Sequence, residues 1–405
     1  LYFLVAVFSV IYLKNVEMTL RTLFALSIIL SFLLGTRMDN ILIVALMFLH
    51  SFFITKEGIV KKSLVCLLGF MPFIIWILFS TWYYGFPFPN TAYAKLNTGF
   101  EISEYIFRGF DYVVRSLLCD IPLMLLLLSA AVVLLKKRNI KAFVVGLGIF
   151  AYLLYVIYIG GDFMVGRHLT VIYLLSLIII FYSVDFDLSR NVLACFVLLS
   201  LFSVAYNAFL RESVNDNLYT KNFLCHQETS ITDEKAFYYK FNVFDYLYNK
   251  FVLNTDLNKP VMKETLFSRD NRFVLLKRVV VGRHAYYLKR ADPRIFVLDL
   301  IALSDEFLSR LPAYKNRWRV GHVFRVLPKG YLNSLLNGGN LVEDIDLHEF
   351  YEHLRKIVSG DLFDADRLRM ILEFNLGKYN KLISHEYEWE EFIGREEIDS
   401  LCPAN

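Results

Sequence analysis

Charged side chains are scarce in this sequence of 405 residues. Only 20% of the residues are Asp, Glu, Lys or Arg, whereas soluble globular domains carry roughly 25%. The net charge is +4, which gives no basic field for binding nucleic acid. Hydrophobic residues make up 56% of the chain, too many for a disordered protein. The composition therefore argues against a single water-soluble domain and against a nucleic-acid partner.

Cysteine is also rare, with five residues in the chain. None forms a CxxC pair, and none has metal-ligand spacing with histidine, so we expect neither a metal site nor a cofactor. Cys66 and Cys195 lie in apolar runs, where cysteine packs as a small hydrophobic residue. Cys225 and Cys402 would form a bridge only in an oxidising compartment, and the sequence alone does not favour that pairing.

The few charges are unevenly distributed. Residues 1–210 hold 25 of the 82 charged side chains, so this half is about 12% charged and residues 211–405 are about 29% charged. Residues 1–210 therefore fit a lipid environment, and residues 211–405 fit water. We expect a transmembrane domain over 1–210 and a soluble domain over 211–405.

Eight apolar runs separated by short polar breaks fill the first 210 residues. They cover approximately 1–13, 22–35, 41–54, 63–84, 121–135, 142–159, 170–182 and 192–210. Several are shorter than the ~20 residues that cross a bilayer core. Short runs still serve as membrane helices where they end against protein or a water-filled cavity. A soluble core accounts for one such run but not for eight, so we expect a polytopic α-helical membrane domain.

The basic residues predict the orientation of these helices through the positive-inside rule. Lys and Arg gather in the breaks 14–21, 55–62, 136–141 and 183–191, and are sparse in 36–40, 85–120 and 160–169. The first set is therefore expected in the cytoplasm and the second outside it. This places the protein in the cytoplasmic membrane as a multi-pass protein with an extracytoplasmic C-terminal domain.

The long outer loop 85–120 contains a predicted amphipathic helix. Ile106, Phe110, Val113 and Leu117 recur at helical spacing among charged residues, which is typical of a helix in the plane of the interface. Such a helix either lines a groove for a lipid tail or merely rests on the membrane, and the sequence favours neither.

The C-terminal half changes period and predicts a small α/β domain. Apolar runs rich in β-forming residues predict strands at 273–281, 285–288 and 294–300. Ser304 followed by two acidic residues predicts the start of a helix. Residues 347–358 and 365–376 are also expected to be helical.

Three polar segments at the predicted outer face are candidates for chemistry. They contain Arg37 and Asp39, then Asn90 and Lys95, and then Asp162, Arg167 and His168. Charged groups near membrane helices are costly and often functional, although an Asp–Arg pair that caps two helix ends is an ordinary structural alternative. Glycines at 160, 161 and 166 permit tight turns close to a ligand.

These segments offer what a sugar on a polyprenyl phosphate requires. A phosphate leaving group needs a cation, best the forked guanidinium of Arg. An acceptor hydroxyl needs a carboxylate or His to orient or take its proton. A transporter also places charges in helix breaks, so composition alone does not separate the two.

Four segments resemble a family of polytopic GT-C-type glycosyltransferases. They are 83–96 (YYGFPFPNTAYAKL), 160–169 (GGDFMVGRHL), 299–312 (DLIALSDEFLSRLP) and 318–331 (WRVGHVFRVLPKGY). The family's best-known members are the terminal arabinofuranosyltransferases of mycobacterial cell-wall synthesis, and related membrane proteins are named for flagellar motor control. The resemblance covers nearly the whole chain.

The resemblance implies transfer of a sugar, arabinofuranose among the candidates, from a polyprenyl-phosphate donor to an extracytoplasmic glycan or other cell-envelope acceptor. It also implies an acidic pair in a first outer loop. Because the chain begins inside an apolar run at Leu1, we expect that loop to be missing, which leaves Asp162 and Asp39 as catalytic candidates. Arg167, His168, Arg37, Asn90 and Lys95 are the donor-binding candidates.

Two positions depart from the family's pattern. Met38 replaces a proline in an Arg-Pro-acid element, and Ala302 replaces glycine in Gly-Leu-x-Asp, which weakens a role for Asp305. His322 is better explained as a packed histidine than as a base, and Asp299 is expected to end a strand and cap the next turn. The alternative function is a non-catalytic membrane assembly or flagellar-motor-control protein on the same scaffold.

The charge bias predicts the topology directly. A reporter fused after Lys137 should read as cytoplasmic, and one fused after Asn217 as extracytoplasmic. The measurement is paired alkaline phosphatase and green fluorescent protein fusions at both positions. The reverse pattern would move every outer loop to the other face.

Overall fold

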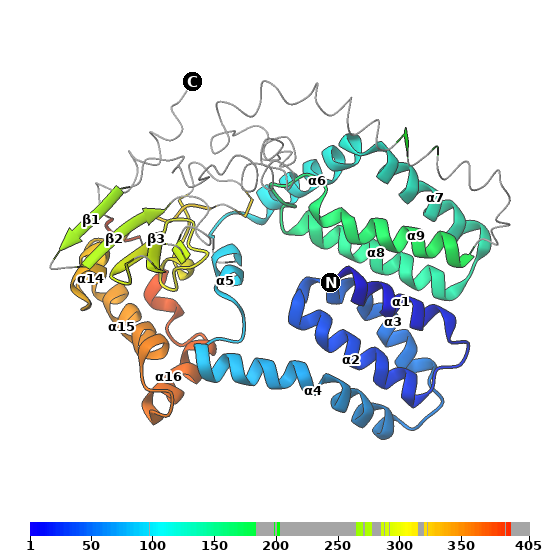
Figure 1. The fold of residues 1–405 in the computed structure, drawn as a ribbon, viewed down its shortest axis with the longest axis horizontal. Helices are drawn as coiled ribbons and strands as arrows, with labels where there is room; N and C mark the ends of the chain where they lie inside the picture. The colour runs from blue at the N-terminus through cyan, green and yellow to red at the C-terminus, as the bar shows by residue number, and fades with distance from the viewer. Residues whose placement is uncertain are drawn as a thin grey trace, which may run out of the picture. The chain divides into compact units, whose positions relative to one another are not determined.

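The architecture is that of a computed structural model, shown in Figure 1. It describes residues 1–96, 98–183, 198, 201–202, 265–269, 272–277, 285–286, 288–290, 292–314, 320–321, 323–384 and 386–389. Within these residues the chain is mostly helical and has a small sheet.

The apolar runs of the first half form helices, as predicted. Seven runs correspond to α1 (Tyr2–Lys14), α2 (Leu20–Thr36), α3 (Ile41–Ile54), α4 (Ile59–Tyr84), α7 (Ile121–Lys137), α8 (Ile140–Tyr158) and α9 (Thr170–Ser183). The eighth run, 192–210, lies almost entirely outside the described residues.

Two of the described helices are long and apolar enough to cross a membrane. They are α4, with 26 residues, and α8, with 19. A third candidate is the pair formed by α6 (Ile102–Cys119) and α7, which bends by 102° at its break. The shorter apolar helices have 10–17 residues, below the length that spans a bilayer core alone.

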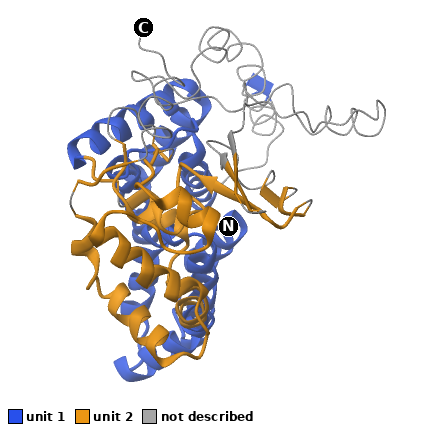
Figure 2. Cartoon of the chain, turned by 90° about the vertical axis from the view of Figure 1, so that its left-hand side faces the viewer, with its two compact units in different colours: residues 1–76, 101–220, 231–236 blue, residues 77–100, 221–230, 237–405 orange. Residues whose placement is uncertain are grey.

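The chain forms two compact units, coloured separately in Figure 2. The first comprises Leu1–Trp76, Glu101–Thr220 and Ile231–Ala236, and the second comprises Ile77–Phe100, Lys221–Ser230 and Phe237–Asn405. Residues 77–100, which sequence places within the membrane domain, therefore group with C-terminal residues.

Close helix contacts in the first unit depend on glycine. A Cβ added to Gly109 of α6 would lie 2.1 Å from the carbonyl oxygen of Ile157 in α8. A Cβ at Gly148 of α8 would lie 2.3 Å from the carbonyl oxygen of Ile43 in α3. Small residues permit this approach of backbones where lipid removes the hydrophobic drive for helices to associate.

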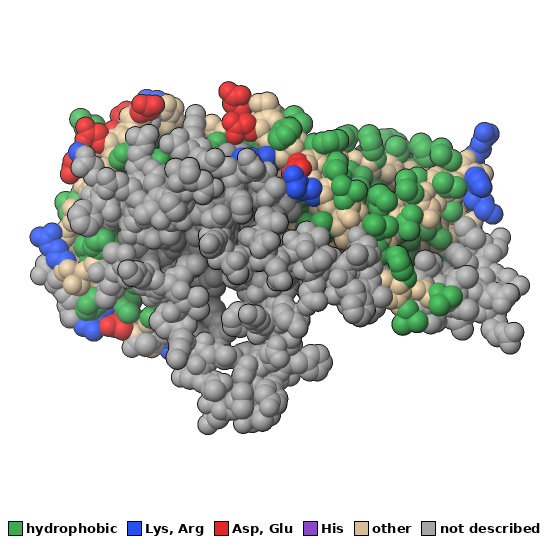
Figure 3. Space-filling model, turned by 90° about the horizontal axis from the view of Figure 1, so that it is seen from above, with side chains coloured by type: hydrophobic (Ala, Val, Ile, Leu, Met, Phe, Trp, Pro, Cys, Tyr) green, Lys and Arg blue, Asp and Glu red, His purple; other side chains and the backbone are tan. Residues whose placement is uncertain are grey.

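The predicted amphipathic helix is present as α6, and the structure shows which face is buried. Gly109, Tyr112 and Ser116 are buried, whereas Phe107 and Phe110 are 76% and 61% exposed. Of the predicted stripe, Val113 and Leu117 are partly buried and contact the core, while Ile106 and Phe110 are exposed. Figure 3 shows hydrophobic side chains over this part of the surface.

The second unit contains a three-stranded sheet in the order β1-β2-β3. The strands are β1 (Thr265–Arg269), β2 (Arg272–Lys277) and β3 (Ile295–Asp299). β1 and β2 are antiparallel, with Phe267 opposite Val274, and β2 and β3 are parallel, with Val274 opposite Phe296. β2 confirms residues 273–277 of the strand predicted at 273–281, whose other residues lie outside the described part of the chain. β3 confirms residues 295–299 of the strand predicted at 294–300.

Two local predictions are wrong. Residues 285–286 and 288–290 are helical rather than a strand, because aromatic and β-branched content alone does not distinguish a short helix from a strand. Ser304 does not start a helix. Asp305 instead accepts hydrogen bonds from the amides of Phe307 and Leu308, and only a short 3-10 turn, η5 (Leu308–Arg310), follows.

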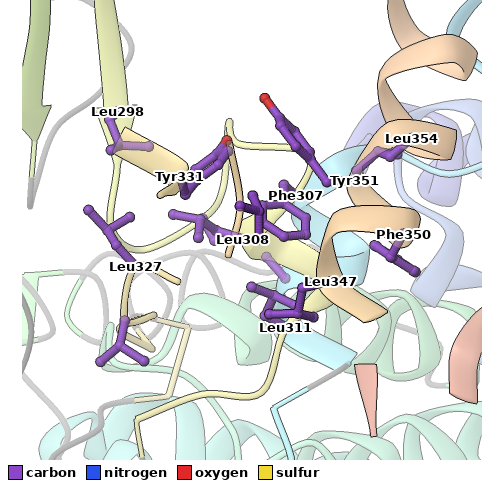
Figure 4. Packing of buried hydrophobic residues seen from close by; sticks show 14 of the residues in the cluster. Leu298, Phe307, Leu308, Leu311, Leu327, Tyr331, Leu347, Phe350, Tyr351 and Leu354 are labelled. Carbon is purple, nitrogen blue, oxygen red and sulfur yellow. The ribbon is translucent and has the colours of Figure 1, made fainter. Parts of the chain in front are cut away.

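Three helices follow the sheet in the second unit: α14 (Tyr331–Asn337), α15 (Ile345–Ser359) and α16 (Ala365–Asn375). The last two confirm the predicted helices, and each begins at an Asp that accepts an amide hydrogen bond, Asp344 for α15 and Asp364 for α16. Figure 4 shows Phe307 in one hydrophobic core with Tyr331 of α14 and Tyr351 of α15.

Gly109→Ala should destabilise the first unit by about 1–3 kcal/mol, because its methyl group has no room beside Ile157 and overpacking forces the helices apart. Gly35→Ala is the matched control: nothing lies within 4 Å of its added Cβ. This control should be neutral or gain about 0.4–1 kcal/mol from a stiffer unfolded chain. Thermal unfolding in detergent measures both, and equal effects would refute the close contact.

Candidate functional site

Arg37 and Asp39 form an ion pair where α2 ends. The guanidinium Nε donates to Asp39 Oδ1 at 3.0 Å, and Nη2 contacts the other carboxylate oxygen. Asp39 lies in the 3-10 helix η1 (Met38–Asn40), and the side-chain amide nitrogen of Asn40 also donates to Asp39 Oδ1 at 3.3 Å. The side chains of Arg37 and Asp39 are 35% and 13% exposed, so the carboxylate is the more enclosed partner.

The loop between α8 and α9 brings Asp162 and Arg167 together. Arg167 Nε contacts Asp162 Oδ2, and the other carboxylate oxygen accepts the amide of Phe163 at 2.8 Å. The loop turns at Gly161, where φ is +72° and an added Cβ would lie 2.4 Å from the Tyr112 side chain. Asp162 is buried, while the Arg167 side chain is 40% exposed.

His168 connects this loop to the Arg37–Asp39 pair. It follows Arg167 in η2 (Arg167–Leu169) and is buried. Its Nδ1 lies 3.3 Å from Arg37 Nη2 and 3.1 Å from the hydroxyl of Tyr152. Arginine nitrogens only donate hydrogen bonds, so this contact requires Nδ1 to accept. His168 is then neutral, with its proton on Nε2.

Three residues that the sequence did not single out hold this loop in place. Tyr152 bonds the His168 ring, the Tyr112 hydroxyl accepts the His168 amide at 3.2 Å, and the Ser116 hydroxyl accepts the Gly166 amide at 3.1 Å. Tyr152 stands in an apolar stretch, whereas Tyr112 directly follows Asp111. Because a buried tyrosine hydroxyl needs a hydrogen-bond partner, the position of Tyr152 is the one that the sequence could have identified.

Asn90 and Lys95 belong to the second unit, in or beside α5 (Asn90–Leu96). The Asn90 amide nitrogen lies 2.9 Å from the carbonyl oxygen of Asp305 and 3.2 Å from that of Ala302, and its oxygen accepts the Ser309 hydroxyl at 2.8 Å. This asparagine fixes a loop of the second unit. Lys95 is exposed.

Asp299 ends β3 and caps the following turn, as predicted. Its carboxylate accepts the amides of Ile301 at 3.0 Å and Leu303 at 2.8 Å, and both the amide and hydroxyl of Ser304. Ala302 lies within this turn at φ +61°, in the left-handed region that favours glycine. His322 and Tyr287 lie outside the described residues.

Beyond this turn, Asp305 and Arg310 are buried and Glu306 is partly buried. Burial raises the pKa values of Asp305 and Glu306, and the charge of Glu306 raises the pKa of Asp305 further. Burial also lowers the pKa of Arg310 to about 10. The Arg310 guanidinium lies 3.6 Å from the ring centre of Tyr93 and 4.3 Å from that of Phe86, an arrangement that compensates a partly desolvated cation.

Tyr331 completes the surroundings of Asp305 by donating its hydroxyl to Oδ2 at 2.9 Å. These hydrogen bonds of Asp305 and Asp299 all join residues of the second unit. Among the residues that the structure describes, no group of three or more His, Cys, Asp or Glu side chains could hold a metal ion.

Comparisons with protein-family models, with curated proteins and with solved structures find no match to this chain. The function of this chain is therefore inferred from its sequence and from the geometry of its first unit.

The raised pKa of Asp305 predicts how stability depends on pH. Unfolded carboxyl groups lose their proton near pH 4, whereas buried Asp305 keeps it to higher pH. The stability that protonated Asp305 contributes is complete below about pH 4. It is lost as the pH rises toward the pKa of Asp305 in the folded protein. The slope is up to about 1.4 kcal/mol per pH unit for one proton. Asp305→Asn should remove this part of the pH dependence. The measurement is the free energy of unfolding by denaturant from about pH 4 to pH 9.

Asp364→Asn is the control. The pKa of Asp364 is lowered by the amide of Asp366, so above its unfolded pKa it exchanges no proton on unfolding, and the variant should keep the parent's slope. An unchanged slope in Asp305→Asn would show that Asp305 is ionised in the folded protein.

Proposed function

We propose that this protein is a membrane glycosyltransferase, which transfers a sugar from a polyprenyl-phosphate donor to a glycan or other cell-envelope acceptor outside the cytoplasm. The observation that carries the proposal is the contact between Arg37 and His168 in the first unit, where His168 directly follows Arg167 in the chain. The chain separates Arg37 and His168 by 131 residues, yet their side chains lie 3.3 Å apart.

Arg37 contacts the His168 ring, Arg167 precedes His168 in the chain, and both guanidinium groups are partly exposed. A planar guanidinium binds phosphate through two parallel hydrogen bonds, so Arg37 and Arg167 suit the phosphate of a lipid donor. Their carboxylate partners, Asp39 and Asp162, hold them in position. When the donor phosphate loses the sugar, the same cations stabilise the charge that develops on the leaving group.

The acceptor needs a group to receive the proton of its hydroxyl. Asp39 and Asp162 are the candidates in this chain, and Asp39 is the more accessible, at 13% exposed against 3%. His168 is not suited to take the proton at Nδ1, because Arg37 already donates there. Its Nε2–H is a hydrogen-bond donor, which fits contact with a phosphate or a sugar oxygen.

A lipid donor also requires an apolar surface next to the site. The outward side chains of α6 are Ile106, Phe107, Phe110 and Leu118, each at least 44% exposed. The inward face of the same helix provides Tyr112 and Ser116, which hold the His168 loop. One helix thus presents apolar groups outward and supports the polar cluster inward, which supports a membrane-embedded GT-C-type site.

The resemblance to GT-C-type glycosyltransferases is consistent with two further details. The 160–169 segment forms the loop with Asp162, Arg167 and His168. Ala302 takes the left-handed conformation that suits the glycine of the Gly-Leu-x-Asp pattern. Both details support the proposed family without depending on composition.

A non-catalytic assembly or motor-control protein is the alternative. It is favoured by the fact that each arginine of the cluster is already paired, Arg37 with Asp39 and Arg167 with Asp162. In that case the pairs are helix-end caps whose removal affects stability alone.

Substitution of Arg167 separates the two. Arg167→Ala should weaken binding of a polyprenyl-phosphate sugar by roughly 10- to 150-fold, because a hydrogen bond to a charged group contributes about 1.5–3 kcal/mol. Arg167→Lys should recover only part of the affinity, since an ammonium lacks the guanidinium fork. Donor affinity and thermal stability are measured on the same purified variants.

Arg115→Ala is the matched control. Arg115 also pairs with a carboxylate of the first unit, Asp111, four residues earlier in α6, and is 46% exposed. An exposed pair of this kind contributes about 0.3–0.5 kcal/mol, so donor affinity should not change. If Arg167→Ala lowers stability while the folded fraction binds donor normally, the structural cap is the correct reading.

A further inference from the structure

Helix α16 is tied to the C-terminal end of α4 by a buried arginine. Arg367 donates from Nη1 to the carbonyl oxygen of Trp82 at 2.9 Å and from Nη2 to that of Tyr83 at 3.0 Å. Its Nε donates to the carbonyl oxygen of Ile357 at 2.8 Å. These bonds satisfy carbonyl groups that the last turn of α4 leaves without helical partners. Figure 1 shows α16 against this end of α4.

A second bond ties the other end of α16 to the same place. The side-chain amide nitrogen of Asn375 donates to the carbonyl oxygen of Gly85 at 2.8 Å. Gly85 itself admits no side chain, because φ is +85° and an added Cβ would lie 2.2 Å from Ile357 Cγ2. Both ends of α16 are therefore held against residues 82–85.

An apolar stripe lies beside the side of α16 that carries Asn375. Leu368, Leu372 and Leu376, the residue that follows the last turn of α16, recur every four residues, so they lie along one side of the helix. They are 37%, 64% and 85% exposed. Asn375 lies three residues beyond Leu372, so the stripe borders the side of the helix that faces residue 85.

Phe363 extends this stripe toward α4. It is 78% exposed, and its ring centre is 5.6 Å from that of Trp82. Around Trp82 the last turns of α4 carry Phe79, Tyr83 and Tyr84, which contact one another and are 41–54% exposed. Exposed aromatic side chains thus extend from the end of α4 to Phe363, two residues before α16.

The length of α4 places this end at the border of a membrane. Its 26 residues extend about 39 Å at 1.5 Å per residue, whereas the hydrocarbon core is about 30 Å thick. The surplus of about six residues lies in the headgroup layer on this count. Exposed Trp, Tyr and Phe residues gather at such interfaces.

We propose that α16 is a membrane-surface helix: its stripe of Leu368, Leu372 and Leu376, together with Phe363, inserts into the bilayer–water interface beside α4. The partner of this surface is the lipid bilayer. The inference rests on the part of the proposed function that places α4 in the membrane, and is independent of the chemistry at His168. Arg367, by fixing α16 to the helix end, is the residue that positions the second unit's stripe at that interface.

Depth-dependent fluorescence quenching tests the proposal on the whole chain. The five native cysteines are replaced by serine, and single cysteines at Leu372, Leu376, Leu78 or Ile345 carry an environment-sensitive fluorophore. The protein is reconstituted in phosphatidylcholine–phosphatidylglycerol vesicles that contain lipids spin-labelled near the headgroup or near the tail end. Circular dichroism and thermal unfolding check that each variant keeps the parent fold.

Ile345 is the matched control for the stripe. It is 84% exposed, as Leu376 is at 85%, and stands at the start of α15, roughly 18 Å along the helix from Ile357 by its twelve-residue separation. Leu78, 64% exposed in α4, tests the premise that α4 lies in the bilayer.

Labels at Leu372 and Leu376 should be quenched several-fold more strongly by the headgroup spin label than the label at Ile345. If the Leu78 label is quenched while the Leu372 and Leu376 labels show no excess over Ile345, the proposal is overturned and the membrane premise stands. Iodide quenching then tells whether water or another protein covers the stripe. If the Leu78 label is not quenched either, α4 is outside the bilayer and both the premise and the proposal fail.

Discussion

The cost of leaving a buried charge without partners is the constraint on which the structure depends. Arg325 and Arg367 are both fully buried, and each uses its guanidinium to bind three main-chain carbonyl groups. Arg325 donates to the carbonyl oxygens of Leu311, Val323 and Ala94, at 2.7–3.1 Å. Because a buried guanidinium without such partners costs several kcal/mol, these bonds fix the loops and helix ends around them.

The same constraint shapes the first unit, where the surroundings are apolar and the partners are carboxylates and rings. Asp162 and Asp39 each pair with an arginine, and His168 accepts from Arg37 while its amide is held by Tyr112. The polar groups gather where helices end, because main-chain amides and turns are available there. Elsewhere glycine contacts such as Gly109 against Ile157 bring the helices together without polar groups.

In the proposed function, the same arginine side chains stabilise the fold and bind the donor. A site for a lipid phosphate must offer cations to a ligand that has itself left water, and those cations must be held in position before the ligand arrives. The ion pairs of Arg37 and Arg167 meet both needs, which is why stability and donor affinity have to be measured together. In the second unit, Asn90 and Asp299 bond the main chain of the 299–309 loop, and their polar atoms serve that loop.

The sequence by itself determined the long helices and two of the three described strands, because apolar period and run length decide local structure where a helix is long. It placed seven apolar helices, of which α4 and α8 are long enough to cross a membrane, together with α6, α15, α16, β2 and β3. It also identified Asp299 as a cap, and gathered Arg37, Asp39, Asp162, Arg167 and His168 as polar groups of interest. It did not predict α5, α14 or β1. It did not decide that Ala285 and its neighbours are helical, since short runs fit either period.

Only the tertiary structure decided which groups meet. Local pattern does not report that Arg37 lies beside His168, or that Tyr152 and Tyr112 bond this histidine, because those contacts arise from the packing of α2, α6, α8 and the loop before α9. Periodicity located the amphipathic stripe of α6, but the packing decided which of its residues are buried: Val113 and Leu117 contact the core, whereas Ile106 and Phe110 are exposed. Periodicity shows that a helix has two faces, and its neighbours determine which face is inside.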